Sequence, residues 1–227
     1  GSDTAANLGL DTLTTRTDEV NDAGIVDMGY HYPITGMGMV PGDMDFDDIS
    51  RVCPWIETSA DLGLDLDAEQ KAHPRVFKSH LDAHRVPAGG RYIVSCRNPC
   101  DAAYSMYKFM EGWLLEPGTV TADDFVRGSY VAAGNAPGSS GGDYWTHLTS
   151  WWARRNDPDV VFMAYEHMQQ DLDGTVRRVA EFMDIELDDE LFAITCEHGS
   201  LPFMQRHKDR FDDLIVRERS VRVCGLP

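Results

Sequence analysis

Long apolar runs and clustered basic residues are both missing from the 227-residue sequence. No apolar run approaches the roughly 20 residues that a membrane-spanning helix needs, so we expect no membrane domain. The chain does not open on a basic segment followed by an apolar one, and we therefore expect no secretory signal. Acidic residues outnumber basic ones by 38 to 20, for a net charge of −18. This charge argues against general binding of nucleic acids or anionic membranes, because phosphate groups are bound by clustered Lys and Arg.

Paired cysteines and metal-ligand patterns are missing as well. The five cysteines are odd in number and form no CxxC pair, so we expect neither a disulfide framework nor a zinc site, and a cytoplasmic location. His80 and His84 are four residues apart, as metal ligands can be, but further ligands are lacking, and we expect no metal. No GxxxxGK[ST] motif is present, which disfavours a P-loop kinase.

What the sequence does contain is typical of one soluble α/β domain, with 42% apolar and 26% charged residues. Residues 76–78, 92–96 and 160–164 are short apolar runs suited to buried parallel strands. Asn98 is a good N-cap, with Pro99 at the first position of the helix that follows. Further helices are predicted at 143–154, 172–183, 188–194 and 201–207. The pattern predicts a parallel central sheet flanked by helices.

The order of these elements also suggests where the domain begins. Residues 1–43 lack a sustained helical or strand period, whereas the pattern sharpens over 44–227, which we take as the domain. The Gly/Ser-rich stretch 134–142 is predicted to be a loop, either a solvated surface loop or a lid over a substrate cleft.

Chemically capable side chains follow each predicted strand. Lys78 and His80 lie at the end of the first, Arg97 at the end of the second, and Tyr165 at the end of the third. Ligands of open α/β sheets bind outside the carboxyl ends of the strands, so one edge of the sheet is predicted to hold a ligand.

Each of these residues has a chemical and a structural interpretation. Arg97 precedes a capped helix N-terminus, which favours an anion, and Ser105 on the same helix could donate to that anion. Arg97 could equally pair with a structural carboxylate, and Ser105 could be incidental. His80 is a candidate general base and Lys78 could neutralise developing charge; the alternative is a pair of ordinary surface side chains.

Several motifs together resemble a known family. Arg97-Asn98-Pro99-Cys100-Asp101, followed by Ser105, Met106 and Tyr107, resembles the R-[ND]-P-x-D-x-x-x-S-x-Y signature of PAPS-dependent sulfotransferases of the cytosolic type. The other motifs that match in the family's order are Pro54-Trp55-Ile56-Glu57, Pro74-Arg75-Val76-Phe77-Lys78-Ser79-His80, Tyr165-Glu166-His167-Met168, Ala180-Glu181-Phe182 and His198-Gly199-Ser200-Leu201.

The resemblance implies a fold related to the P-loop nucleotide kinases, and transfer of a sulfuryl group from PAPS to a small-molecule alcohol, phenol or amine. It assigns the catalytic base to His80 and assistance to the sulfuryl or bridging oxygens to Lys78. Arg97 and Ser105 would hold the 3′-phosphate of PAPS. Tyr165 and Ser200 would contact the adenine, and Leu201 stands where many members have Phe.

Two departures from the family leave an alternative open. The Lys-Ser-Gly-Thr-Thr loop that cradles the 5′-phosphosulfate is not found, and residues 30–38 at its place contain no lysine. The Gly-rich basic segment that usually completes the 3′-phosphate site is also not found, so the domain is expected to be truncated. The alternative to an enzyme is therefore an inactive remnant that serves as a nucleotide-binding or interaction module.

The N-terminal stretch has a weaker resemblance of its own. Residues 15–33 resemble the closing segment of bacterial β-helix repeat proteins, which suggests a fused or misassembled reading frame. We accordingly predict that residues 1 to about 40 pack poorly against the domain. The aromatic residues could line an acceptor cleft, but most are predicted to be core; they are Phe109, Trp113, Trp145, Trp151 and Trp152.

Overall fold

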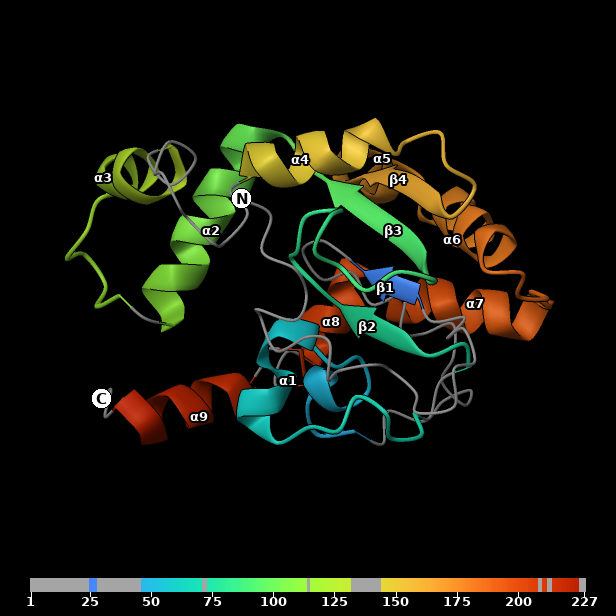
Figure 1. Ribbon diagram of the computed structural model, residues 1–227, viewed down its shortest axis with the longest axis horizontal. Helices are drawn as coiled ribbons and strands as arrows, with labels where there is room; N and C mark the ends of the chain where they lie inside the picture. The colour runs from blue at the N-terminus through green and yellow to red at the C-terminus, as the bar shows by residue number, and fades with distance from the viewer. Residues whose placement is uncertain are drawn as a thin grey trace.

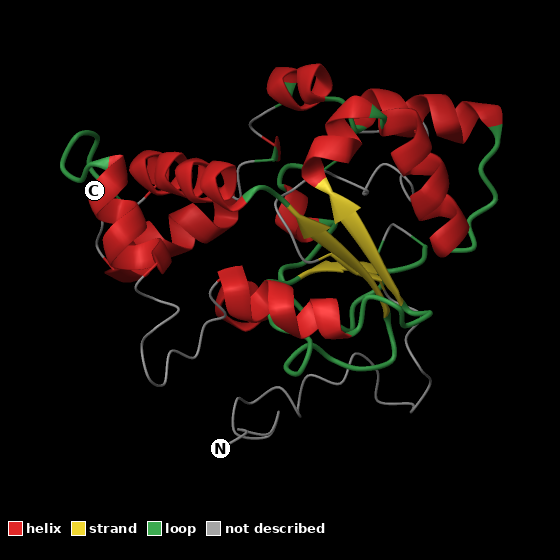
Figure 2. Cartoon of the chain, turned by 90° about the horizontal axis from the view of Figure 1, so that it is seen from above, coloured by secondary structure: helices red, strands yellow, loops and turns green. Residues whose placement is uncertain are grey.

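The fold is built on a parallel sheet in which four strands lie in the order β2-β1-β3-β4. A computed structural model describes residues 25–27, 46–70, 73–113, 115–131, 144–207, 210–211 and 214–224. The strands are β1 (Ile25–Asp27), β2 (Val76–Lys78), β3 (Arg91–Cys96) and β4 (Val160–Ala164). Figure 2 shows the twisted sheet with helices on both sides. The predicted α/β class with a parallel sheet is confirmed, and the three predicted strands lie within one residue of their expected bounds.

Strand β1 is the part of the sheet that sequence analysis missed. It lies between β2 and β3, with Val26 opposite both Phe77 and Tyr92. The prediction of poor packing is therefore wrong for residues 25–27, because their backbone is paired on both sides. A run of three residues is too short to show a period in the sequence. The rest of residues 1–43 and the predicted 134–142 loop lie outside the described residues.

The sheet separates two apolar clusters, and β3 contributes to both. Tyr92 and Val94 belong to one cluster with Phe77, Val160 and Trp151, while Ile93 belongs to the other with residues of β4 and the C-terminal helices. This division follows from the two-residue period of a strand. Since both faces are covered, the strands read as continuous apolar runs.

The described helices lie between β1 and β2, between β3 and β4, and after β4. Those before β4 are α1 (Ile56–Leu62), α2 (Pro99–Trp113), α3 (Ala122–Phe125) and α4 (Tyr144–Ala153), with a 3₁₀ turn η4 (Ile49–Arg51) and a π-helical turn η5 (Val126–Val131). Those after β4 are α5 (Tyr165–Gln170), α6 (Leu172–Phe182), α7 (Asp189–His198), α8 (Leu201–Arg206) and α9 (Leu214–Cys224). In Figure 1, α2 leads away from the tip of β3 and α3 lies beyond it.

Helix α6 shows how the local sequence specifies these elements. Its N-cap Asp171 accepts a hydrogen bond from the backbone of Gly174 (2.8 Å), and Val176, Val179 and Ala180 are buried. These residues form the apolar face of the predicted 172–183 helix, and this face packs in the same cluster as Ile93 and Val161 of the sheet.

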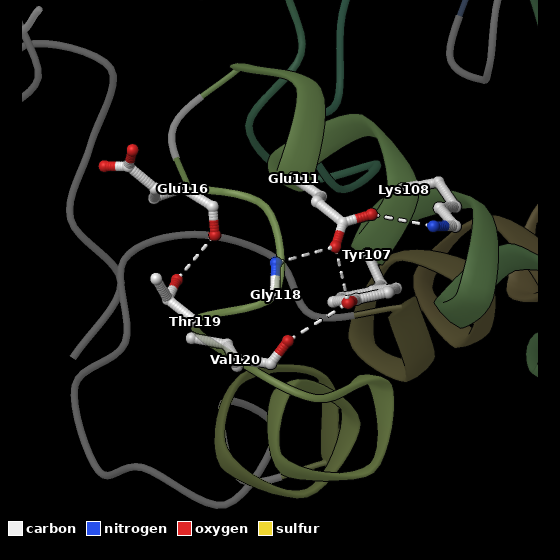
Figure 3. A network of polar contacts seen from close by, with 7 residues as sticks. All are labelled: Tyr107, Lys108, Glu111, Glu116, Gly118, Thr119 and Val120. Atoms are coloured by element: carbon white, nitrogen blue, oxygen red, sulfur yellow. Dashed lines mark hydrogen bonds and ion pairs between the residues drawn. The ribbon is translucent and has the colours of Figure 1, made fainter.

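A network around Glu111 fixes the turn that follows α2 (Figure 3). The Glu111 carboxylate accepts hydrogen bonds from Tyr107 Oη (2.9 Å), Lys108 Nζ (2.7 Å) and the backbone of Gly118 (3.3 Å). The bond from Lys108, followed by that from Tyr107, lowers the pKa of Glu111. Gly118 has a φ of 80°, a conformation that favours glycine. Glu111 therefore joins the helix to a chain segment seven residues further on.

Among the described residues, no helix is both long and apolar enough to cross a bilayer.

The prediction that most of the aromatic residues lie in the core is wrong, because only one of the four whose side chains are described is buried. Trp151 is fully buried, packs on Tyr92 with ring centroids 5.0 Å apart, and donates from Nε1 to the Leu81 carbonyl (3.2 Å). Trp145, Trp152 and Phe109 are instead exposed. The side chain of Trp113 lies outside the described residues.

We predict that Trp151→Ala lowers the free energy of unfolding by about 3–5 kcal/mol, as expected for a large buried aromatic. Trp152→Ala on the next, exposed position serves as the control and should cost less than about 1 kcal/mol. Urea denaturation of the two variants measures both values, and equal losses would contradict the assignment of Trp151 to the core.

Candidate functional site

Three of the parallel strands end in polar side chains at one edge of the sheet. Lys78 is the last residue of β2, Arg97 follows β3, and Tyr165 follows β4 as the first residue of α5. In Figure 1 the arrowheads of β2 and β3 point toward the side of the molecule on which α2 begins. The edge predicted to hold a ligand therefore exists, and it lies where open α/β sheets bind ligands.

Lys78 and His80 are brought together through a third residue, Trp55. Lys78 is 5% exposed, and its Nζ lies 4.3 Å from the centroid of the Trp55 ring. The exposed His80 meets the same indole edge to face, with ring centroids 4.8 Å apart. A buried cation and an exposed imidazole thus share one aromatic neighbour, although 23 residues separate Trp55 from Lys78 in the sequence.

Helix α4 holds the segment that follows His80. Trp151 Nε1 donates to the Leu81 carbonyl, and the backbone of Ala83 donates to Ser150 Oγ (3.1 Å). Ser79 is fully buried and accepts a hydrogen bond from the backbone of Leu81 (3.1 Å). The segment is therefore fixed both by its own turn and by a neighbouring helix.

Arg97 lies against the predicted adenine contact. Its guanidinium stands 4.3 Å from the centroid of the Tyr165 ring, and its carbonyl accepts a hydrogen bond from Tyr144 Oη (2.6 Å). Arg97 Nε is buried and has no hydrogen-bond partner within the described residues. A buried donor of this kind costs free energy unless it is satisfied, which is consistent with a site for an anion.

Glu166 joins the ends of β3 and β4. Its Oε1 accepts a hydrogen bond from the backbone of Asn98 (2.8 Å), and this bond, aided by the Arg97 charge, lowers the pKa of Glu166. Asn98 Oδ1 in turn accepts from the backbone of Cys100 (2.9 Å), which confirms Asn98 as the N-cap of α2. The described residues show no ion pair between Arg97 and a carboxylate, although the Arg97 charge contributes to the lowered pKa of Glu166.

Among the described residues, Ser105 and Ser200 form no hydrogen bond with Lys78, His80, Arg97 or Tyr165. Ser105 is half-buried in the second turn of α2. Ser200 caps α8, because its Oγ accepts from the backbone of Phe203 (3.3 Å) and donates to the Glu197 carbonyl (2.7 Å). Tyr165 Oη accepts a hydrogen bond from Gln169 Nε2 (2.9 Å). Residues 30–38, where the family's 5′-phosphosulfate loop would fall, lie outside the described residues.

Sequence reasoning assigned no role to three residues that shape this edge. Glu57 Oε1 accepts a hydrogen bond from the backbone of His80 (2.5 Å), Tyr144 holds the Arg97 carbonyl, and Trp55 contacts both Lys78 and His80. The only signal was the motif that contains Trp55 and Glu57, since each contact spans more than 20 residues. Within the described ranges, no group of three or more His, Cys, Asp or Glu side chains could hold a metal ion.

The family model described as "Sulfotransferase domain" matches residues 42–220. The chain belongs to the sulfotransferase family. Sulfotransferase 6B1 of Danio rerio is 32% identical over 161 residues, which are 67% of this chain and 53% of the relative. Sulfotransferase 2B1 of Mus musculus is 28% identical over 161 residues, or 67% of this chain and 44% of the relative. The chain thus spans about half the length of these sulfotransferases.

Solved structures show the same sulfotransferase fold. Mouse sulfotransferase SULT7A1, complexed with PAP, has a TM-score of 0.56 at 22% identity, covering 82% of this chain and 66% of its own. Retinol dehydratase, in complex with androsterone and inactive cofactor PAP, has a TM-score of 0.59 at 18% identity, covering 84% and 68%. At these identities the likeness concerns the fold.

A half-buried histidine of α4 makes the stability of this sulfotransferase domain depend on pH. Burial lowers the pKa of His147 to about 4, against the opposing effect of Asp82. The unfolded chain binds a proton at this histidine below its ordinary pKa of 6.5, whereas the folded chain does so only near pH 4. His147 therefore costs no stability above pH 6.5, and stability is lost as the pH falls from 6.5 toward 4.

We predict that His147→Gln flattens this part of the stability curve. The wild type should lose up to about 3 kcal/mol more than the variant between the two pKa values, because a glutamine does not titrate. Chemical denaturation at a series of pH values gives both curves, and parallel curves would show that His147 is not buried in its neutral form.

Proposed function

We propose that this sulfotransferase domain transfers a sulfuryl group from PAPS to a hydroxyl or amine of a small molecule. The observation that supports this most is the placement of Lys78, Arg97 and Tyr165 at the carboxyl ends of three parallel strands, with His80 two residues beyond Lys78. The PAP found in the sulfotransferase and retinol dehydratase structures supports PAPS as the donor.

The residues at the ends of β3 and β4 fit the adenosine half of the donor. Arg97 has a buried, unpartnered Nε among the described residues and precedes the 15-residue helix α2, whose N-terminus favours an anion. Arg97, with Ser105 further along α2, holds the 3′-phosphate. Tyr165, against which Arg97 lies, contacts the adenine together with Ser200.

The residues at the end of β2 act on the reacting atoms. His80 takes the proton from the acceptor hydroxyl or amine as that atom bonds to sulfur. The bond between sulfur and the oxygen of the 5′-phosphate breaks, and its electron pair leaves with the nucleotide. Lys78 stabilises the negative charge on the sulfuryl and leaving oxygens, as a cation does in phosphoryl transfer. The products are a sulfate ester or sulfamate and adenosine 3′,5′-bisphosphate.

The acceptor is proposed to be an alcohol, phenol or amine with an apolar body. Phe109 on α2 and Trp145 on α4 leave large aromatic surfaces exposed on helices adjoining the site. Such surfaces bind apolar molecules through the hydrophobic effect. Retinol dehydratase, one of the solved structures similar to this chain, is in complex with androsterone, an apolar molecule that carries a hydroxyl group.

The donor site is tested by calorimetric titration with adenosine 3′,5′-bisphosphate. We expect micromolar binding by the wild type and binding at least about 10-fold weaker in Arg97→Ala, because a charge-assisted hydrogen bond is lost. Arg155→Ala is the matched control: this exposed arginine of similar charge stacks on Trp152 and should not affect the titration.

This titration separates a transferase from an interaction module that binds no nucleotide, whereas an inactive nucleotide-binding module is recognised only by the chemical step tested below. A folded wild-type protein without measurable binding overturns the transferase and leaves a sulfotransferase fold without its nucleotide. Binding that survives Arg97→Ala unchanged overturns the assignment of Arg97 to the 3′-phosphate.

The chemical step is tested by His80→Asn and Lys78→Met, with radiolabelled PAPS and a panel of alcohols, phenols and amines. We expect kcat to fall by about 10²–10⁴-fold in His80→Asn, the range of general base catalysis, while affinity for adenosine 3′,5′-bisphosphate is kept. His84→Asn changes an exposed histidine four residues further along and is the control. Equal rates in His80→Asn and His84→Asn would contradict the role of His80.

A further inference from the structure

The segment Pro54 to Glu57 runs beside the end of β2 and includes the N-cap and the first two residues of α1. The backbone of Lys78 donates a hydrogen bond to the Pro54 carbonyl (2.9 Å), and Trp55 pairs with Lys78 as an isolated parallel bridge. The Trp55 carbonyl accepts from the backbones of Thr58 (3.1 Å) and Ser59 (3.0 Å), and Ser59 Oγ adds a third bond (2.7 Å). The backbone that carries the indole is therefore fixed on both sides.

The Trp55 side chain is placed against polar groups instead of the core. Its neighbour Ile56 belongs to the apolar cluster with Phe77 and Trp151, whereas Trp55 is only half-buried. The described contacts of the Trp55 ring are with the Lys78 ammonium at 4.3 Å and the His80 ring at 4.8 Å.

The contact with Lys78 is electrostatically favourable. An ammonium above an indole face is attracted by the ring quadrupole, and this attraction is strongest where water is excluded. Lys78 is 5% exposed, so its charge is largely removed from water. The indole therefore attracts the Lys78 ammonium and confines it to one side of the ring.

The contact with His80 is shared between Trp55 and Glu57. The indole meets the imidazole at an interplanar angle of 79°, which limits the rotation of the His80 ring. Glu57 Oε1 accepts the backbone N–H of His80 at 2.5 Å, which fixes the position of its Cα. One short segment thus positions the main chain of His80 and the side chains of both His80 and Lys78.

We propose that Trp55 and Glu57 are positioning residues for sulfuryl transfer, which hold Lys78 and His80 in their reactive arrangement. The inference rests on the proposed function, because Lys78 and His80 are the groups that act on the transferring atoms there. Positioning of this kind changes the rate of the chemical step, with little effect on the distant 3′-phosphate contact of Arg97.

Two variants of Trp55 separate positioning from packing. Trp55→Phe keeps an aromatic face for Lys78, whereas Trp55→Leu keeps apolar volume without one. We expect kcat to fall about 10- to 100-fold in Trp55→Leu and to be largely kept in Trp55→Phe, with affinity for adenosine 3′,5′-bisphosphate unchanged in both. Trp152→Leu is the matched control, because its exposed indole also lies beneath a cation, Arg155 at 4.9 Å, away from the reacting groups.

A spectroscopic measurement tests the contact without relying on activity. In a ¹H–¹³C correlation spectrum, the ε-methylene of Lys78 should be shifted upfield by the indole ring current. This shift should disappear in Trp55→Leu and persist in Trp55→Phe and Trp152→Leu. The Lys78 ε-methylene signal is assigned as the one that is missing from the spectrum of Lys78→Arg.

Glu57 is tested in parallel. Glu57→Ala removes the acceptor of the His80 N–H and should lower kcat, whereas Glu57→Gln keeps an acceptor oxygen and should restore most of the rate.

The outcomes distinguish this inference from the proposed function. A wild-type rate in Trp55→Leu, or a Lys78 signal that does not move in that variant, overturns the inference alone. A wild-type protein that neither binds adenosine 3′,5′-bisphosphate nor transfers a sulfuryl group overturns the proposed function.

Discussion

The parallel direction of the strands is the constraint on which the site depends. Because β2, β3 and β4 all run the same way, their carboxyl ends meet at one edge, and residues from distant parts of the sequence meet there. Lys78 and Tyr165 are 87 positions apart in the numbering, yet each ends or follows a strand of the same sheet. The covered faces of the sheet leave the edge as the place where polar groups can be exposed to a ligand.

Most of the sheet and its edge could be predicted from the sequence. Residues 76–78 and 160–164 were recognised because buried parallel strands are short, continuous apolar runs, and Asn98 and Pro99 because helix starts have a local signature. The site residues followed from one topological rule together with family motifs. The signature around Arg97 located a helix N-terminus that the structure places at the end of β3.

What the sequence could not provide are contacts that depend on tertiary packing. Three residues of β1 show no period, so an inner strand was taken for a poorly packed segment. Trp151 and Trp152 are adjacent and chemically identical, but the helix turns one toward Leu81 and the other toward solvent. Likewise, nothing local in Pro54 to Glu57 indicates that Trp55 meets a lysine from the end of another strand.

The anchoring of α4 has a consequence for how acceptor specificity can change. Its inner positions, Trp151 and Ser150, are tied to the segment beside His80, whereas its outer positions, Trp145 and Trp152, face solvent. Substitutions on the outer face can therefore accumulate without displacing the segment that carries the proposed base, His80. Under the proposed function, a directed-evolution library aimed at new acceptors is best confined to that outer face.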